Sequence, residues 1–549
     1  MARVRLGEPR LDHFGELMSD TLNRRSFLQY GSAAVAATVV GPHPLTPVPL
    51  RSPPSPRAER GAGGEDDLEE MTIAQLQDAM RSGARTAQSI CAAYLARIAA
   101  LDFKLHAVLE TNPDALRIAG SLDAERKAGK VRGPLHGIPV LVKDNITTGD
   151  RMMTTAGSLA LAGHTPPRDA PLVARLRAAG AVILGKTNLS EWANIRSNQS
   201  SSGWSARGGQ CANPYALDRN PCGSSSGTGA AIAASFAAVG IGTETDGSIV
   251  CPSSACSLVG VKPTLGLIEG AGIIPIAHSQ DTAGPMARTV ADASVLLGAL
   301  SGHDYSASLD PNGLRGARIG VARKKFFGYS PEADALVETA IDVLKRQGAV
   351  IVDPADIPHA GEYDDSELIV LLYELKADLA AYLAQWAPSA SVKSLADVIA
   401  FNEAHKASEM PYFGQELFIQ AQQKGPLTDP AYRDALAKDQ RLSRTEGLDV
   451  VFTQQNLDAI VAPTGSPPWP TDLVNGDHFL GASSTPAAVA GYPSVAVPAG
   501  YSFGLPVGMS FIGKANSEAM LLKLAYAYEQ AAKPRKAPRF LLTADLASA

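Results

Sequence analysis

Several features that direct a protein to nucleic acid or to a charged membrane surface are absent from this sequence. The chain of 549 residues has no basic tail and no long run of one charge, and its formal net charge is -6. Such a balance gives no reason to expect nucleic acid or an anionic membrane as a partner. Charged residues make up 19% of the chain and hydrophobic residues 45%, which is ordinary for a soluble globular protein.

Cysteine is also scarce. The five cysteines are Cys91, Cys211, Cys222, Cys251 and Cys256. Their odd number and the lack of metal-type spacing argue against both a disulfide framework and a zinc site. We therefore expect small buried cysteines near a packed centre, and no metal.

A long apolar run is lacking even at the N-terminus, where the composition differs from the rest of the chain. Arg24 and Arg25 stand before a weakly apolar stretch, Phe27 to Val40, which is shorter than the roughly 20 residues that cross a bilayer. This arrangement resembles a twin-arginine export signal, and Met18 gives it a more usual start than Met1. The alternative is a disordered tail with a chance Arg-Arg pair.

The chain is divided accordingly. We predict that residues 1–41 are the export signal and that residues 42–66, rich in Pro, Gly, Arg and Ser, are a flexible linker. Residues 67–545 are predicted to form one large globular domain. A signal of this kind implies transport by the twin-arginine export machinery, a periplasmic or secreted bacterial protein, and no stable membrane anchoring.

The pattern after residue 70 predicts an α/β fold. Thr72 and Gln75 form a candidate capping box at a helix start, and apolar residues recur at helical spacing from Ile90 to Leu101. Short apolar runs then alternate with helical stretches: Ile138–Val142, Ala181–Leu184, Ile319–Ala322, Val350–Val352, Ala459–Ala462 and Ser494–Val497. Strands of this kind belong to a sheet that helices cover on both faces. Residues 360–445 are helical in pattern and are predicted to form a lid or side lobe.

Glycine and serine are concentrated in two segments, Pro221–Gly229 and Gly240–Pro252. This density lets the backbone turn tightly and approach a ligand closely. The stretch between them, Ala230–Val239, is apolar and predicts a buried helix, so that two hydroxyl-rich loops meet around a dry centre. Upstream, Lys143 ends an apolar strand, where burial would lower its pKa and allow it to act as a neutral base.

Three simpler interpretations compete with hydroxyl chemistry. Gly223–Gly227 matches the G-x-S-x-G nucleophile elbow with Ser225 as nucleophile, but the elbow needs a preceding strand, and Asp218–Pro221 does not have the pattern of one. A phosphate-binding loop would need a lysine in this segment. The third interpretation takes Lys143 as a surface residue and the serines as turn formers. The joint occurrence of the lysine and both serine segments argues against it.

These segments resemble the motifs of the amidase signature family, and the resemblance runs from about residue 70 to residue 540. Gly137–Asn145 looks like the family's lysine motif, Gly223–Ser225 like its first serine motif and Gly242–Ser248 like its second. The separation of Ser224 from Ser248 is the spacing that the family uses. Further family-like segments are Gly260–Thr264, Gln280–Met286, Ala490–Pro493 and Gly504–Met509.

The resemblance implies a single large α/β/α domain around a mixed, twisted central sheet, and an enzyme that hydrolyses carboxylic amides. It implies a Ser-Ser-Lys triad with Ser248 as the nucleophile, Ser224 as the proton relay and Lys143 as the base. The oxyanion hole and part of the substrate site are expected from the turn before the nucleophile: Thr245, Asp246 and Gly247. No metal or organic cofactor is required by this scheme.

Departures from the common family pattern narrow the substrate class. Many members have Gly-Gly before the nucleophile and an arginine two residues after it, where this chain has Asp246-Gly247 and Val250. Ser226 and Cys222 also stand where glycine is usual. As a set, these residues resemble the bacterial peptide amidases. The expected reaction is therefore removal of the C-terminal amide from peptides, with release of ammonia.

Three alternatives stay open at this point. One is a broad amidase for small aliphatic or aromatic amides. Another is an enzyme like the family's amidotransferase component, which releases ammonia for transfer to misacylated tRNA. An export signal argues against this alternative, because charged tRNA is cytoplasmic. The third is a non-catalytic protein that binds amides, against which the retention of all three triad residues argues.

Overall fold

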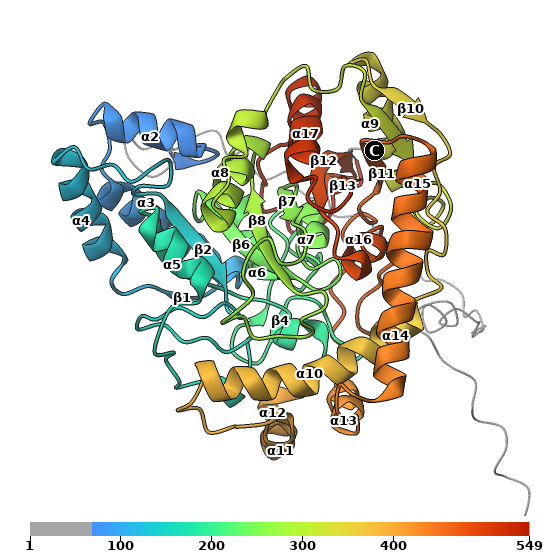
Figure 1. Ribbon diagram of the computed structural model, residues 1–549. Helices are drawn as coiled ribbons and strands as arrows, with labels where there is room; N and C mark the ends of the chain where they lie inside the picture. Colours follow the sequence, from blue (N-terminus) through green and yellow to red (C-terminus); the bar gives the residue numbers. More distant parts are fainter. Residues whose placement is uncertain (1–67, 548–549) are drawn as a thin grey trace, which may run out of the picture. The chain divides into compact units, whose positions relative to one another are not determined.

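Eleven strands form one mixed sheet in the described part of the chain, residues 68–547 of a computed structural model (Figure 1). Their order across the sheet is β1–β3–β2–β6–β8–β7–β12–β13–β11–β9–β10. The bounds are β1 Val108–Thr111, β2 Pro139–Lys143, β3 Val182–Thr187, β6 Val239–Glu244, β7 Val259–Lys262, β8 Thr282–Ala287, β9 Arg318–Val321, β10 Val350–Val352, β11 Ala459–Pro463, β12 Ser494–Ser502 and β13 Leu505–Ile512. A separate two-stranded ribbon pairs β4, Trp204–Ser205, with β5, Gly209–Gln210.

The directions of the strands confirm the predicted mixed sheet. β2 runs parallel to both β3 and β6, whereas β8 runs antiparallel to both β6 and β7. Every apolar run that the sequence predicted as a strand overlaps one of these elements. The predicted capping box is also present, because Thr72 and Gln75 each accept a hydrogen bond from the other's backbone N–H.

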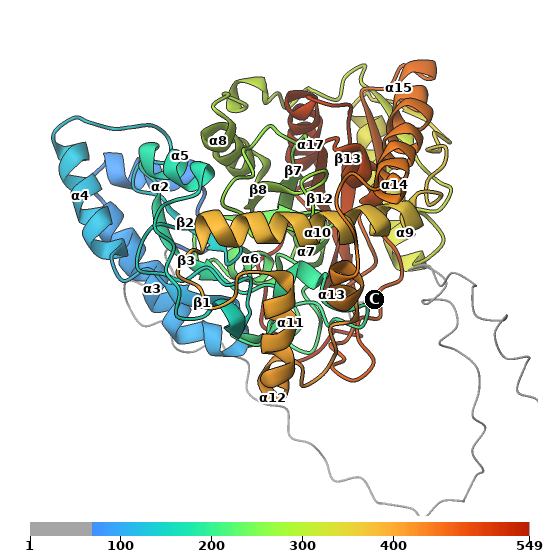
Figure 2. The ribbon, with the colours of Figure 1, turned by 60° about the horizontal axis from the view of Figure 1, so that its bottom comes forward.

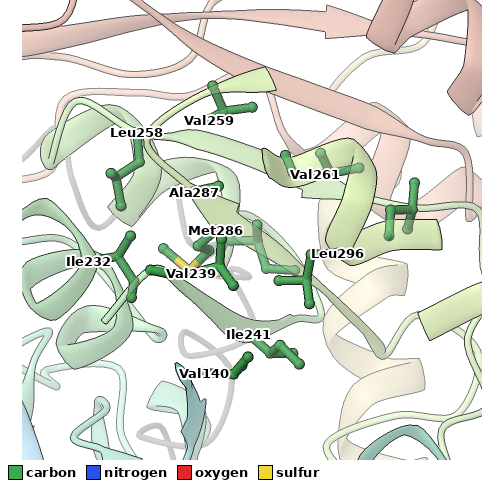
Figure 3. Packing of buried hydrophobic residues seen from close by; sticks show 14 of the residues in the cluster. Val140, Ile232, Val239, Ile241, Leu258, Val259, Val261, Met286, Ala287 and Leu296 are labelled. Carbon is green, nitrogen blue, oxygen red and sulfur yellow. The ribbon is translucent and has the colours of Figure 1, made fainter. Parts of the chain in front are cut away.

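Helices pack on both faces of the sheet. Those outside the helical lobe are α2 Ile73–Arg81, α3 Ala87–Leu101, α4 Ala115–Lys127, α5 Pro171–Ala178, α6 Ser226–Ala233, α7 Val250–Ala255, α8 Val290–Ser301, α9 Pro331–Arg346, α16 Thr485–Ala490 and α17 Glu518–Ala532. Gly240 of β6 faces α6, since a side chain there would meet Ile232. Val239 and Ile241 pack in the same core as Leu296 of α8 (Figure 3). The same core contains Ile232, so α6 and α8 both pack against β6.

The predicted helix over Ala230–Val239 is wrong at its end. Helix α6 stops at Ala233, and Val239 already begins the central strand β6. The chain turns between them at Ser235, whose φ is 56°. The segment from Gly240 to Glu244 is therefore a strand and not part of a serine loop. Its glycines misled the prediction, because Gly240 leaves room for α6, which packs directly on the sheet, and Gly242 leaves room for Ser225 and Met286.

The segment 360–445 is mostly helical, as predicted. It contains α10 Asp364–Trp386, α11 Leu395–Ala404, α12 Lys406–Glu409, α13 Glu416–Gln422 and α14 Pro430–Gln440, and a π-helix with α15 Asp449–Gln454 follows. Figure 2 shows α10 running across the domain, with α11 and α12 below it in this view. Leu375 and Leu379 of α10 share a second hydrophobic core with Trp192 and Ile274, so the lobe is attached to the domain by apolar packing.

The predicted export signal, residues 1–41, and the linker, residues 42–66, lie outside the described residues. Both assignments, and the domain bounds 67–545, stay predictions. Within residues 68–547, no helix combines the length and the apolar character that crossing a membrane requires.

Candidate active site

Strand β2 ends at Lys143, whose side chain is fully buried. Its Nζ lies 2.8 Å from Ser224 Oγ, 2.9 Å from Thr243 Oγ1 and 3.3 Å from Thr243 O. Burial lowers the pKa of Lys143 to about 7, although the nearby carboxylates of Asp281 and Glu244 act in the opposite direction. The buried strand-end position and the lowered pKa that the sequence predicted are both present.

Ser224 belongs to the first serine loop, Pro221–Ser225, which leads into α6. Its side chain is fully buried and contacts Lys143 Nζ. The neighbouring Ser225 has different partners. Its Oγ donates to Thr243 O at 3.1 Å and accepts from Thr243 N at 3.2 Å. No strand directly precedes this loop in the described chain, so the nucleophile elbow centred on Ser225 is absent.

Ser248 belongs to the second serine loop, Thr245–Ile249, between β6 and α7. The loops meet where Ser225 N donates to Ser248 O at 3.2 Å. Ser248 is 8% exposed, in contrast to the fully buried Ser224. Its Oγ has no hydrogen-bond partner within residues 68–547, so this hydroxyl is uncommitted.

The turn before Ser248 presents a row of unused backbone donors. Among the hydrogen bonds of the described residues, none is donated by the N–H of Asp246, Gly247 or Ser248. Gly247 adopts a φ of 80°, in the left-handed region that glycine tolerates best. Successive free amides in such a turn form a concave site that binds an anion or a developing oxyanion.

Side chains from several distant elements hold this turn. The Asp246 carboxylate accepts hydrogen bonds from the hydroxyls of Ser484, at 2.5 Å, and Thr485, at 2.8 Å. Thr245 Oγ1 donates to Asp281 at 2.5 Å. Gln280 Nε2 donates to Thr245 O at 3.3 Å. All three predicted turn residues therefore lie together, next to Ser248.

Sequence reasoning missed the roles of Thr243 and Asp281. Thr243 Oγ1 accepts hydrogen bonds from both Lys143 Nζ and Asn145 Nδ2. Asp281 lies close enough to affect the pKa of Lys143. Burial raises the pKa of Asp281 itself to about 6. Both residues stand inside family-like segments, which was the available signal, but the pattern alone did not show which side chain they contact.

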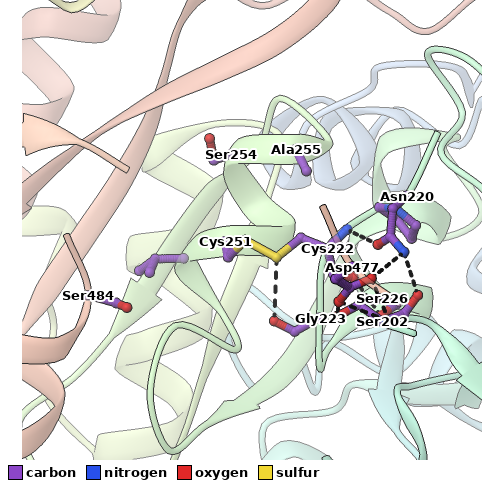
Figure 4. The surroundings of a disulfide bond; sticks show 12 residues. Ser202, Asn220, Cys222, Gly223, Ser226, Cys251, Ser254, Ala255, Asp477 and Ser484 are labelled. Atoms are coloured by element: carbon purple, nitrogen blue, oxygen red, sulfur yellow. Dashed lines mark hydrogen bonds between the residues drawn. A yellow bond between two sulfur atoms is a disulfide. The ribbon is translucent and has the colours of Figure 1, made fainter. Parts of the chain in front are cut away.

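The expectation of five free buried cysteines is wrong for two of them. Cys222 and Cys251 form a disulfide with a Cα–Cα distance of 5.9 Å (Figure 4), while the other three are free and buried. An odd count did not exclude one bridge. The pair forms because the first serine loop and the start of α7 pack side by side, although 29 positions separate them in the sequence.

Comparison with known proteins agrees with this geometry. The model of the amidase family matches residues 89–522. The chain belongs to the amidase family. The resemblance to that family seen in the sequence is thereby confirmed, and the chain is an amide-hydrolysing enzyme.

Individual amidases extend the comparison over most of the chain. The solved peptide amidase from Stenotrophomonas maltophilia is 51% identical, with a TM-score of 0.83, and the match covers 86% of this chain and 99% of that one. A probable amidase of Arabidopsis thaliana is 42% identical over 499 residues, 86% of this chain and 92% of the relative. One subunit of the glutamyl-tRNA(Gln) amidotransferase of Chloroflexus aurantiacus is 35% identical, over 84% of this chain and 97% of the relative.

Proposed function

We propose that this amidase removes the C-terminal amide from peptides, through an acyl-enzyme formed by Ser248, Ser224 and Lys143. The observation that carries the proposal is the contact of 2.8 Å between Ser224 Oγ and a fully buried lysine Nζ whose pKa is lowered to about 7. An amide needs an activated nucleophile and a proton for its leaving nitrogen. A neutral lysine that contacts a relay hydroxyl can supply both functions.

The hydrogen bonds around Lys143 are compatible with the neutral amine. A neutral Nζ has two N–H donors and one lone pair. The two donors can be taken by Thr243 O and Thr243 Oγ1, both within 3.3 Å. The lone pair is then left for the hydroxyl proton of Ser224. In this state the lysine is ready to accept a proton from the serine.

Catalysis then proceeds by proton transfer along the triad. As Ser248 Oγ attacks the amide carbon, its proton passes to Ser224, and the proton of Ser224 passes to Lys143. The negative charge that develops on the carbonyl oxygen is stabilised by the free amides of the turn at Asp246 and Gly247. The relay returns a proton to the nitrogen, the C–N bond breaks and ammonia leaves. Water hydrolyses the acyl-enzyme along the same proton path.

The choice of peptide amides is supported by two observations. The chain is 51% identical to a peptide amidase over nearly all of that enzyme's length. It also has the Asp246, Val250, Ser226 and Cys222 set that departs from the common family pattern. Asp246 is fixed by two hydroxyls next to the free amides, where a glycine would leave the turn without this anchor.

Ammonia release from a panel of amides tests this proposal. We expect turnover of C-terminally amidated dipeptides and no cleavage inside unamidated peptides. Comparable or faster turnover of fatty amides or small aromatic amides would favour the broad amidase. Activity that appears only with misacylated tRNA present would favour the amidotransferase. Absence of turnover with every substrate, together with amide binding, would favour a non-catalytic protein.

We further propose export by the twin-arginine route to the periplasm or beyond. Arg24 and Arg25 ahead of the apolar stretch support it, and so does the disulfide, since such bonds persist mainly in oxidising compartments. Replacement of both arginines by lysine should retain the protein in the cytoplasm on cell fractionation. Undiminished export of this variant would contradict the proposal, and a cytoplasmic precursor that begins at Met1 would contradict a start at Met18.

A further inference from the structure

The Cys222–Cys251 disulfide joins the two segments that carry the catalytic hydroxyls. Cys222 stands just before Ser224 in the first serine loop, and Cys251 lies in the first turn of α7, just after Ser248. Figure 4 shows the bond between these segments, with Gly223 close by. Both cysteines are buried. The bond therefore ties the segment that carries Ser224 to the segment that carries Ser248.

The backbone at Cys222 indicates that its side chain is needed. Its φ is 59°, in the left-handed region that costs free energy for any residue with a Cβ. A glycine would adopt this conformation without that cost, and glycine is the residue usual at this position. The disulfide to Cys251 explains why a cysteine stands here, since only a cysteine can form that bond.

Other connections between the two loops are few. Among the described residues, one direct hydrogen bond joins them, from Ser225 N to Ser248 O at 3.2 Å. Ser225 Oγ also bonds the backbone of Thr243, which belongs to β6 and not to the second loop. The first serine loop is held from the other side by Asn220, whose Oδ1 accepts from Cys222 N at 2.8 Å and whose Nδ2 donates to Ser202 O at 2.9 Å (Figure 4). These bonds fix Cys222 to its own side of the site and not to Ser248.

We propose that the disulfide is a positioning element of the active site, which holds Ser224 in reach of Ser248 so that the oxidised form is the competent enzyme. The proposal rests on the triad proposed above. Small displacements between reacting groups have large effects on rate, since about 1 Å can cost on the order of 100-fold. A covalent bond this near to both hydroxyls restricts such displacements more tightly than a single hydrogen bond.

Reduction removes this restraint by a defined reaction. A dithiol such as dithiothreitol supplies two electrons and two protons, the S–S bond breaks, and Cys222 and Cys251 become thiols while the reagent closes to a cyclic disulfide. Because the restraint acts on the distance between the reacting hydroxyls, we expect kcat to fall and KM to stay nearly constant. A bond with only a structural role would change the melting temperature and leave kcat unaltered.

The test compares the double variant Cys222→Ser/Cys251→Ser with the wild type and with Cys91→Ala. The control variant removes a buried free thiol in α3, outside both serine loops. Each protein is assayed for ammonia release from an amidated dipeptide, well below its melting temperature. The rate of Ser248 labelling by a phosphonate is measured in parallel. We expect the double variant to lose about tenfold to a hundredfold in kcat and in labelling rate, with KM within about twofold, and Cys91→Ala to match the wild type.

Reduction of the folded wild type provides the second measurement, which holds even if the double variant fails to fold. Activity should fall as the thiols of Cys222 and Cys251 appear by alkylation and mass spectrometry, and it should return on reoxidation. Full activity after both thiols have appeared, or an unchanged kcat in a folded double variant, would overturn the proposal. A wild type that releases no ammonia and takes no label at Ser248 would instead refute the triad itself.

Discussion

Lys143 and Lys186 occupy neighbouring strands of the sheet, and both side chains are fully buried. Strand register aligns Lys186 of β3 with Val142 of β2. Because side chains alternate along a strand, the two lysines project from opposite faces. Burial lowers the pKa of Lys143 to about 7 and that of Lys186 to about 8, so each face of the sheet holds a lysine whose charged form burial disfavours.

The partners of these lysines differ. Lys186 Nζ donates to Ile146 O at 2.6 Å and contacts Thr154 Oγ1 at 2.7 Å. Ile146 O has no proton to give, and Thr154 directs its hydroxyl proton to that same carbonyl at 3.5 Å. Lys186 is therefore suited to holding the backbone after β2. Lys143 contacts Ser224, whose loop is bonded to that of the uncommitted Ser248. Burial lowers the pKa on both faces, and the partner decides whether a base results.

The largest effect is expected from Ser248→Ala, because no other hydroxyl in the site can form the covalent intermediate. Turnover and acyl-enzyme formation should both disappear, a loss of about 10⁴ or more. Labelling by a serine-reactive phosphonate, mapped by mass spectrometry, checks the assignment. A label on Ser225 that is lost in Ser225→Ala would restore the nucleophile elbow and refute the triad.

The two lysines can be tested as a matched pair. Lys143→Met should lower kcat by about 10⁴ or more, as loss of a triad member does. Lys186→Met should lower kcat by less than about tenfold, although it should lower the melting temperature because Ile146 O loses its donor. Both variants are assayed below their melting temperatures. Equal losses of kcat would show that burial and not the partner decides the role.

Ser224 and Ser225 sharpen the comparison within one loop. Ser224→Ala should lower kcat by about 10² to 10⁴, with some activity left because a water molecule can take the place of the relay hydroxyl. Ser225→Ala should cost less than about tenfold, since Ser225 Oγ contacts the backbone of Thr243 and not Lys143. Steady-state kinetics of the purified variants decide between them. A larger loss in Ser225→Ala would contradict this division of roles.

The pH dependence follows from the sign of the shift. Since Lys143 must be neutral and its pKa is about 7, kcat/KM should fall as pH drops through about 7. The unfolded lysine keeps a pKa near 10.4, so the unfolded state binds more protons between pH 7 and about 10, and stability should rise with pH in that window. Thermal melting should show this rise in the wild type and a weaker one in Lys143→Met. Identical slopes would contradict the lowered pKa.

The smallest effect is expected from Asp281→Asn. The Asp281 carboxylate raises the pKa of Lys143 and accepts from Thr245 Oγ1. Its replacement should move the acid limb of the kcat/KM profile to lower pH, with a loss of kcat below about tenfold, because the amide oxygen can still accept from Thr245. An acid limb that moves to higher pH would show that Asp281 does not act on Lys143 by charge.

Much of the fold could be predicted because its signals are local. Capping at Thr72, the apolar runs of six strands and the helical lobe all appear in consecutive residues. The triad candidates were found for the same reason, since Lys143 ends an apolar run and Ser224 and Ser248 stand in dense glycine-serine motifs. Strand β6 was missed because Gly240 is there for the close approach of α6 and Gly242 for that of Ser225 and Met286, packing relations that composition does not reveal.

The sequence by itself determined which residue types the site contains: a strand-end lysine, two serine segments and a glycine turn. Only the tertiary structure decided which groups meet. It pairs Cys222 with Cys251, brings Thr243 and Asp281 close to the lysine, and leaves Ser248 slightly exposed while it buries Ser224 fully. The reason is physical: disulfide formation, desolvation and charge effects depend on distances between segments, and those distances are set by how the helices pack on the sheet.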